Sequence, residues 1–330
     1  MYLFMRIFKL HYMCVGLFVF CSNFMAQAQY DPQFSQFMFN KILYNPGFTG
    51  IDEVLNASFI GRNQWMGFDG QPVTQAVCID APIPTGGVGL IFSNDILGAQ
   101  QTTSFSLNYA FRLLLNDGGS FALGLSGGYL QNTLNGMIYR APDGSYEAGS
   151  LIHNDDYIPT VKVSAGAFDL GIGLYLNMKN LYAGLSLTHM LNPTTHFEID
   201  LNSLDIEHSR NIYLMGGYNF EINNNMALRP SLLVKTDLVK TQVDLNAHVV
   251  YEGNLWGGLS YRGVTANSSD ALILLAGINI TNQISIGYSY DITTSGIKNY
   301  SSGSHELIVK YKLLALGKKG AKLIYCPRFL

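Results

Sequence analysis

Two short stretches carry side chains that could do chemistry. Residues 124–128, Gly-Leu-Ser-Gly-Gly, match the G-x-S-x-G pattern of a nucleophilic serine, which requires a sharp strand-to-helix turn that exposes the serine. Residues 153–157, His-Asn-Asp-Asp-Tyr, offer oxygen and imidazole groups of the kind that bind a divalent cation. The elements around each stretch decide between these chemical interpretations and simpler structural ones.

Neither stretch is interpreted as a site. The serine lies inside a run that alternates like a strand, which favours glycine-rich packing, and no serine can be assigned to His189 or His248 as the pair that a membrane phospholipase would need. The acidic stretch lies in a long loop, where a solvated turn is the simpler interpretation. The sequence contains no P-loop, complete dinucleotide fingerprint, zinc spacing or EF-hand loop. We therefore expect no enzyme activity, catalytic residue, cofactor or metal.

The N-terminus has the organisation of a secretory signal peptide. Residues 1–28 carry two basic residues near their start, Arg6 and Lys9, continue through an apolar run and end Ala26-Gln27-Ala28, with small residues where a signal peptidase reads them. A retained transmembrane anchor is less favoured, because the run is short and contains polar residues. Bulky residues before Cys21 argue against a lipoprotein. We expect cleavage after Ala28.

Composition restricts the partners of the mature chain. Cleavage would leave 18 basic and 23 acidic residues, a formal charge of −5, which disfavours nucleic-acid binding. Only Cys78 and Cys326 would remain, too few for a disulfide framework, although a single bridge stays open. The whole chain is 48% hydrophobic and only 13% charged, yet no later stretch is apolar enough to span a membrane as a helix. A closed barrel is the remaining way across a bilayer.

Apolar and small polar residues alternate from Val54 onward. The alternation is clear in residues 104–113, 241–251 and 284–291, and a period of two places the two kinds of residue on opposite faces of a strand. One face suits lipid and the other a polar interior. One interior row could line an open pore, or it could lie in a barrel whose interior is filled by side chains, and the sequence leaves both open. That row is Gln242, Asp244, Asn246 and His248.

The pattern predicts an all-β fold, a transmembrane antiparallel β-barrel of about 14 strands. The expected strands are 54–62, 73–81, 87–96, 101–113, 119–131, 164–177, 181–191, 209–222, 225–237, 240–251, 254–263, 269–280, 283–291 and 303–313. Tight connections alternate with longer ones, except at 238–239, and 132–163 is the longest. Outer-membrane barrels have short periplasmic turns and long external loops, so both termini are expected in the periplasm.

A soluble β-sandwich is the competing fold, because it also alternates and turns at short intervals. The signal peptide and the scarcity of charge argue against it. So do aromatic residues near strand ends, where interfacial girdles form. These are Tyr109, Tyr251, Trp256, Tyr261, Tyr288 and Tyr311.

The opening of the mature chain carries a family resemblance. Residues 31–52, DPQFSQFMFNKILYNPGFTGID, resemble the N-terminal signature of the PorP/SprF family, outer-membrane proteins of the type IX secretion and gliding motility machinery. Similar blocks follow in order to the terminal PRFL, so the resemblance covers essentially the whole mature chain. The blocks are 62–82, 87–113, 231–235, 258–262, 286–296, 301–307 and 327–330. Cys326 and a sparsely basic tail depart from the pattern.

The resemblance implies a non-enzymatic component of the cell outer membrane. Such a protein associates with periplasmic and outer-membrane subunits of the machinery and supports export or surface attachment of cargo proteins such as adhesins. Membership does not identify the cargo or the subunit. A porin or transporter for small solutes or lipids is the alternative, because the composition of the interior does not choose between the two.

The expected organisation is a signal peptide (1–28), a periplasmic lead-in (29–53), a barrel embedded in outer-membrane lipid (54–313) and a periplasmic tail (314–330). The lead-in should pack at the barrel base or inside it. Candidate partner-binding residues lie in both terminal segments and in the loop from residue 62, where arginine and tryptophan are hot-spot types. They are Phe34, Phe37, Phe39, Arg62, Trp65, Pro327, Arg328, Phe329 and Leu330. Purely structural roles, as turn, strand cap or interfacial anchor, are equally open.

Overall fold

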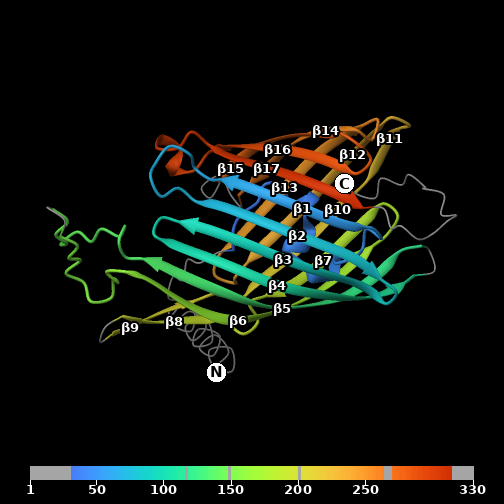
Figure 1. The fold of residues 1–330 in the computed structure, drawn as a ribbon. Coiled ribbons are helices and arrows are strands. Elements are labelled where there is room, and N and C mark those ends of the chain that lie inside the picture. Colours follow the sequence, from blue (N-terminus) through green and yellow to red (C-terminus); the bar gives the residue numbers. More distant parts are fainter. Residues whose placement is uncertain (1–30, 116–117, 148–149, 200–201, 264–269, 314–330) are drawn as a thin grey trace, which may run out of the picture.

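The computed structural model describes residues 31–115, 118–147, 150–199, 202–263 and 270–313. The predicted signal peptide, the tail with Cys326, and residues 327–330 lie outside these ranges. The chain forms a closed antiparallel barrel (Figure 1). Strand β1 (Leu55–Asn63) pairs with β2 (Val73–Ile83) on one side and with the last strand, β17 (Ser304–Leu313), on the other. The predicted all-β barrel is confirmed.

The wall has 14 strand positions among the described residues. The strands between β2 and β17 are β3 (Gly86–Leu97), β4 (Gln100–Leu114), β5 (Ser120–Asn135), β6 (Lys162–Asn177), β7 (Leu181–Thr188), β10 (Asn211–Tyr218), β11 (Phe220–Asn223), β12 (Met226–Thr236), β13 (Thr241–Tyr251), β14 (Leu255–Arg262), β15 (Ala271–Asn279) and β16 (Ile284–Thr293). Strands β10 and β11 share one position, because both pair with β12. The predicted number is therefore confirmed.

Two departures from the predicted strands matter below. The expected strand 209–222 is broken at Asn219, and the expected loop 192–208 contains a hairpin of β8 (Thr194–Ile199) and β9 (Asn202–Glu207) that forms a separate two-stranded sheet. The hairpin was missed because each of its strands has only six residues, too short a stretch for the alternation to stand out. No helix in the described part of the chain is long and apolar enough to cross a membrane.

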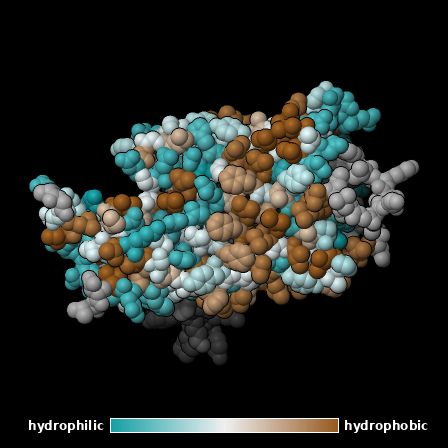
Figure 2. Space-filling view, in the orientation of Figure 1, coloured by the Kyte–Doolittle hydropathy of each residue, from teal (hydrophilic) through white to brown (hydrophobic). Residues whose placement is uncertain are grey.

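Apolar side chains cover the outside of the wall. Alternate residues of β4 point outward, with Leu107 57% exposed and Phe111 44% exposed, while Asn108 and Ala110 between them are buried. Figure 2 shows hydrophobic residues gathered across the strands and hydrophilic ones dominating toward the end with the long loops. Four predicted girdle tyrosines are outward and exposed, namely Tyr109, Tyr251, Tyr288 and Tyr311. The prediction was wrong for Trp256, because the alternation places it inward, where its ring packs against Phe39 in a tilted arrangement with 4.2 Å between the ring centroids.

The interior is filled by the chain itself. Residues before β1 form three short 3-10 turns, η2 (Phe37–Phe39), η3 (Lys41–Leu43) and η4 (Pro46–Phe48), and their apolar side chains join one buried cluster with inward residues of the wall. The predicted interior row on β13 is confirmed as inward, because Asp244, Asn246 and His248 are all buried. A segment thus occupies the lumen where an open pore would need water.

A charged side chain introduced on the lipid face should lower the free energy of unfolding more than the same side chain introduced in a connection between strands. Replacing Leu107 by arginine should lower the free energy of unfolding in lipid bilayers by about 2–4 kcal/mol, because the charge would enter hydrocarbon. Chemical denaturation in liposomes measures it. The matched control is Leu238→Arg in the connection after β12, where the side chain is 79% exposed and the same change should cost little. Equal costs at the two positions would contradict the assignment of the lipid face.

Candidate functional site: the N-terminal segment inside the barrel

Residues 31–52, here called the lumen segment, run through the barrel from its long-loop end to its short-turn end. At the long-loop end, Asp31 bonds to His189, just past the last residue of β7. At the short-turn end, the Gly50 N–H donates to the Asp80 carboxylate near the end of β2, at 2.9 Å. The expected packing inside the barrel is therefore what the structure shows. Whether either end faces the periplasm is taken up under the proposed function.

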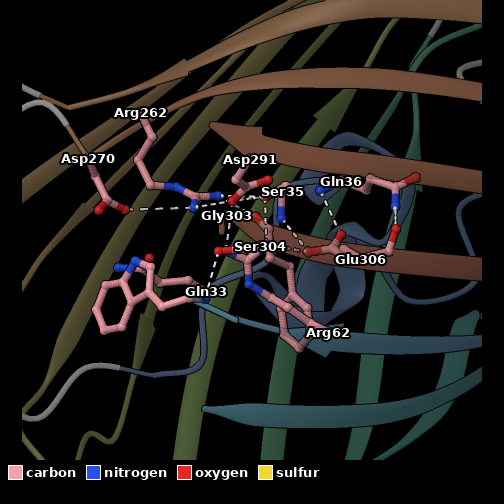
Figure 3. Close-up of polar contacts among 12 residues, drawn as sticks. Gln33, Ser35, Gln36, Arg62, Arg262, Asp270, Asp291, Gly303, Ser304 and Glu306 are labelled. Carbon is pink, nitrogen blue, oxygen red and sulfur yellow. Dashed lines mark hydrogen bonds and ion pairs between the residues drawn. The ribbon is translucent and has the colours of Figure 1, made fainter. Parts of the chain in front are cut away.

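A cluster of buried charges surrounds the start of the segment (Figure 3). Arg62 of β1 pairs with Asp291 of β16 at 2.7 Å and with Glu306 of β17 at 3.1 Å. Arg262 of β14 pairs with Asp244 of β13 at 2.8 Å and with Asp291 at 3.1 Å. Five wall strands thus contribute to one network. Removing one member would leave a charge buried without compensation, which is strongly destabilising.

The lumen segment completes this network rather than only touching it. The Ser35 hydroxyl donates to Asp291 at 2.7 Å and accepts from Arg62 at 2.8 Å and from Arg262 at 3.0 Å. The backbone N–H groups of Ser35 and Gln36 donate to the two oxygens of Glu306 at 2.7 and 2.9 Å. Charge-assisted hydrogen bonds of this kind are about twice as strong as neutral ones. The segment is therefore held by backbone as well as side-chain groups.

The Tyr44-Asn45-Pro46-Gly47 sequence makes the second attachment. The Asn45 side chain accepts from the Gly47 N–H at 2.8 Å and donates to the Leu174 carbonyl of β6 at 2.9 Å, so one amide both shapes the turn and ties it to the wall. Glycine is needed opposite this turn. A Cβ on Gly124 of β5 would lie 2.2 Å from the Gly47 nitrogen. The glycine-rich stretch 124–128 is a packing surface inside a strand, as predicted.

A third attachment, the Asp31 latch, lies at the long-loop end. His189 lies between Asp31 at 2.6 Å and Asp169 of β6 at 2.8 Å, and Tyr213 donates a further hydrogen bond to Asp31. Lys235 of β12 donates to the Asp31 carbonyl at 2.7 Å. Two wall strands and one loop residue thus contact a single residue of the segment, and a third strand, β6, joins through His189.

Burial and charge set the protonation states of the latch. Burial alone would raise the pKa of Asp31, but the charges of His189 and Lys235 and the hydrogen bonds hold it well below its usual range. Burial alone would lower the pKa of His189, but Asp31 and Asp169 raise it to about 10. At neutral pH the latch is therefore an ion pair. Burial and the His189 charge lower the pKa of His208, so its ring is neutral beside the Asn132 amide at 2.8 Å.

The structure brings some predicted site residues together and separates others. Phe34, Phe37 and Phe39 are buried in the lumen. Placing Arg62 in the external loop was wrong, because β1 extends to Asn63 and the strand alternation turns Arg62 inward to the acidic cluster. Trp65 lies beyond β1 at the long-loop end, where its backbone N–H donates to the Ser304 hydroxyl at 3.0 Å.

The HNDDY stretch is a turn. The His153 ring bonds the Tyr146 hydroxyl at 2.9 Å, and the Tyr157 N–H donates to Asp155 at 2.9 Å, so these groups serve local structure. No cluster of three metal-ligating side chains occurs among the described residues. Cys78 is a free, buried thiol that accepts from the Asn40 amide at 3.4 Å.

Sequence reasoning missed Asp291 and Glu306, the partners that make Arg62 important. It also missed Arg262 of the same cluster and the Asp31–His189 pair of the latch. A signal for two of them existed. Arg262 and Glu306 lie at inward positions of strands, and charged residues on a face enclosed by the wall need partners of opposite sign. The pairing itself depends on strands far apart in sequence and could not be seen.

A cavity of about 180 Å³ remains between the lumen segment and one side of the wall. Apolar residues of the segment form one face, including Ile42 and Leu43, and a mostly polar row from β3, β4 and β5 forms the other. The row comprises Ser93, Asp95, Thr102, Ser104, Ser106, Asn108 and Ser126. Ser126 therefore lies on a strand facing this cavity and not at the strand-to-helix turn of a hydrolase.

A closed barrel with an apolar belt and a lumen filled by its own N-terminal segment has the architecture of an outer-membrane protein. The family model for type IX secretion system membrane protein PorP/SprF matches residues 26–311, and the chain belongs to that family. No curated protein matches significantly. Solved structures with a similar fold include the toluene transporter TbuX of Ralstonia pickettii, at 9% identity and a TM-score of 0.47, covering 82% of this chain and 92% of that one. A FadL homologue of Pseudomonas aeruginosa has 11% identity and a TM-score of 0.46, with coverages of 87% and 96%.

The charge cluster predicts how the segment can be released. Arg62→Met should leave Glu306 and Asp291 short of a cation and cost about 3–5 kcal/mol of stability. We expect limited proteolysis of the refolded barrel to cut within residues 31–52 only in this variant. Arg140→Met is the matched control, because Arg140 is exposed in the loop after β5 and donates to the nearby Met137 and Tyr139 carbonyls at 2.9 and 2.6 Å, away from the lumen segment. Equal protection in both variants would contradict the anchoring role.

The latch predicts a pH dependence. His189 has a raised pKa, so its contribution is complete below its ordinary value of 6.5 and is lost as pH rises through about 10. Asp31 has a lowered pKa, so its contribution persists down to pH 3.8 and fades only in stronger acid. The coupling energy between Asp31→Asn and His189→Gln, from double-mutant cycles, should be constant between about pH 4 and 6.5 and shrink toward pH 10. A coupling independent of pH would contradict an ionised latch.

Proposed function

We propose that this protein is a non-enzymatic outer-membrane component of the type IX secretion or gliding machinery. In this role it associates with periplasmic machine subunits and supports export or surface attachment of cargo proteins such as adhesins. Family membership over residues 26–311 is the observation that carries the proposal. The filled lumen supports it, because three separate attachments hold the segment where solute would pass.

The proposed orientation follows from the connections. Short turns such as 224–225 would face the periplasm and the long loops the exterior, as in bacterial barrels. Strands β1 and β17 then begin and end at the periplasmic side, which would place the tail 314–330, with its candidate docking residues 327–330, near machine subunits. The loop containing Trp65 would be available to a partner outside the cell. Phe34, Phe37 and Phe39 would meet a partner only if the segment left the lumen.

The cavity favours one second candidate, a passage for small polar solutes. Its polar wall could support hydrated solutes along β3 to β5 if the lumen segment moved aside. This candidate requires conduction by the purified protein without any partner. The two proposals therefore differ in a measurable property.

Deletion and complementation test the proposed function. Loss of the gene should reduce the surface display of particular exported proteins, measured by surface labelling and mass spectrometry, while uptake of small hydrophilic solutes stays unchanged. Complementation with the full chain should restore display. Wild-type protein that conducts in planar bilayers, together with normal display after deletion, would instead favour the solute passage.

A further inference from the structure

The barrel wall is incomplete beside β6. Strand β5 pairs with β6 along all 16 residues, from Ser120↔Asn177 to Asn135↔Lys162. On the other side, β7 pairs only with Ile172 to Asn177. Among the described residues, positions 162–171 of β6 therefore have no hydrogen-bonded strand neighbour on that side, apart from one bond from the Met190 N–H to the Leu170 carbonyl at 3.0 Å. We call residues 162–170 the open edge.

The strand that would continue the wall along β6 bends away from it after β7. Strands β7 and β10 pair up to Thr188↔Asn211, and β8 and β9 continue the same hairpin from Thr194↔Glu207. Between the two ladders, residues 189–193 oppose only 208–210, and His189 and Asn192 have left-handed backbone conformations at φ of 53° and 45°. The hairpin then packs against β5 and β6 through a small cluster of its own instead of extending the wall. Figure 1 shows β8 and β9 beside β6 at the long-loop end.

The direction of the backbone groups follows from that single bond. The Leu170 carbonyl points away from β5, because it accepts from Met190. A residue in a strand directs its N–H and C=O to the same side, so every second residue of β6 before Leu170 also directs both groups away from β5. The open edge therefore offers the backbone groups of Ser164, Gly166 and Phe168. The Ser164 and Phe168 side chains point outward and are exposed, and Gly166 between them is exposed as well.

A row of outward side chains also stops at this edge. Cross-strand pairs link one outward position on each strand from β1 to β6, and all of these positions carry apolar or aromatic residues. The row is Phe59, Val77, Phe92, Phe105, Tyr129 and Phe168. Phe168 is 76% exposed, whereas Phe105 within the row is 42% exposed, because no strand follows Phe168.

We propose that the open edge binds an extended segment of a partner polypeptide, which adds to β6 as a strand and carries apolar side chains at alternate positions. Lipid tails cannot fill this place, because they offer no donor or acceptor to the backbone groups. A polypeptide strand supplies both, and its apolar residues would continue the row beyond Phe168. The inference rests on the proposed function, since it gives the surface by which a secretion component would hold a cargo protein or subunit.

Site-specific photo-crosslinking tests the edge in cells. A benzoylphenylalanine at position 168 should crosslink a polypeptide that the same residue at position 105 does not. The crosslinked stretch, made as a synthetic peptide, should then bind the purified full-length barrel. Ser164→Pro, which removes an edge N–H, should weaken this binding about tenfold, whereas Ser164→Ala should not. Phe168→Lys should weaken it and Phe105→Lys should not, which keeps the test decisive if the proline variant fails to fold.

Three results would overturn the inference. They are crosslinks at position 168 to lipid alone, crosslinks to a second copy with a dimer in native mass spectrometry, or peptide binding unchanged by both Ser164→Pro and Phe168→Lys. The proposed function fails separately. Normal surface display after gene deletion, with edge-dependent peptide binding intact, would remove the secretion role and leave the docking surface. If deletion of the gene abolishes display but both Ser164→Pro and Phe168→Lys restore it fully, the secretion role stands and the docking surface is not needed for it.

Discussion

Compensation of charge inside the barrel is the constraint on which this structure depends. Arg62 and Arg262 face an enclosed interior, as do Asp244, Asp291 and Glu306, and none of them can remain unpaired there. The wall side chains alone do not satisfy these charges, because the Ser35 hydroxyl and two backbone N–H groups of the lumen segment complete the network. Wall and segment therefore stabilise each other. The Arg62 and Glu306 pair also bridges β1 and β17, which ties the closure of the barrel to the occupancy of its lumen.

The lumen segment is shaped for that place along its whole length. At one end Asp31 joins strands on one side of the barrel, and at the other Gly50 reaches the opposite side of the wall. Between them the Asn45 turn fits against glycines that leave room for its backbone. A segment held at three separate points is a structural part of the barrel, which agrees better with a component of a secretion machine than with a freely conducting pore.

The wall strands differ in length, and the change from long to short strands falls between β6 and β7. Strands β4 to β6 have 15 or 16 residues, while β7 and β10 have eight each. The step between them coincides with the bent hairpin, the Asp31 latch and the end of the row of outward apolar and aromatic side chains. Because His189 sits in the bend and bonds both the segment and β6, the position of the segment and the shape of the wall are linked at that point.

The sequence by itself determined the barrel, the number of strand positions and the inward row on β13, because a period of two is a local property that each strand carries alone. The resemblance of residues 31–52 also indicated the family. Only the tertiary structure decided the partners of Arg62 and the path of the lumen segment. Each of these depends on contacts between residues more than 200 positions apart, such as Ser35 with Glu306, and no local pattern records which strands meet across a closed barrel.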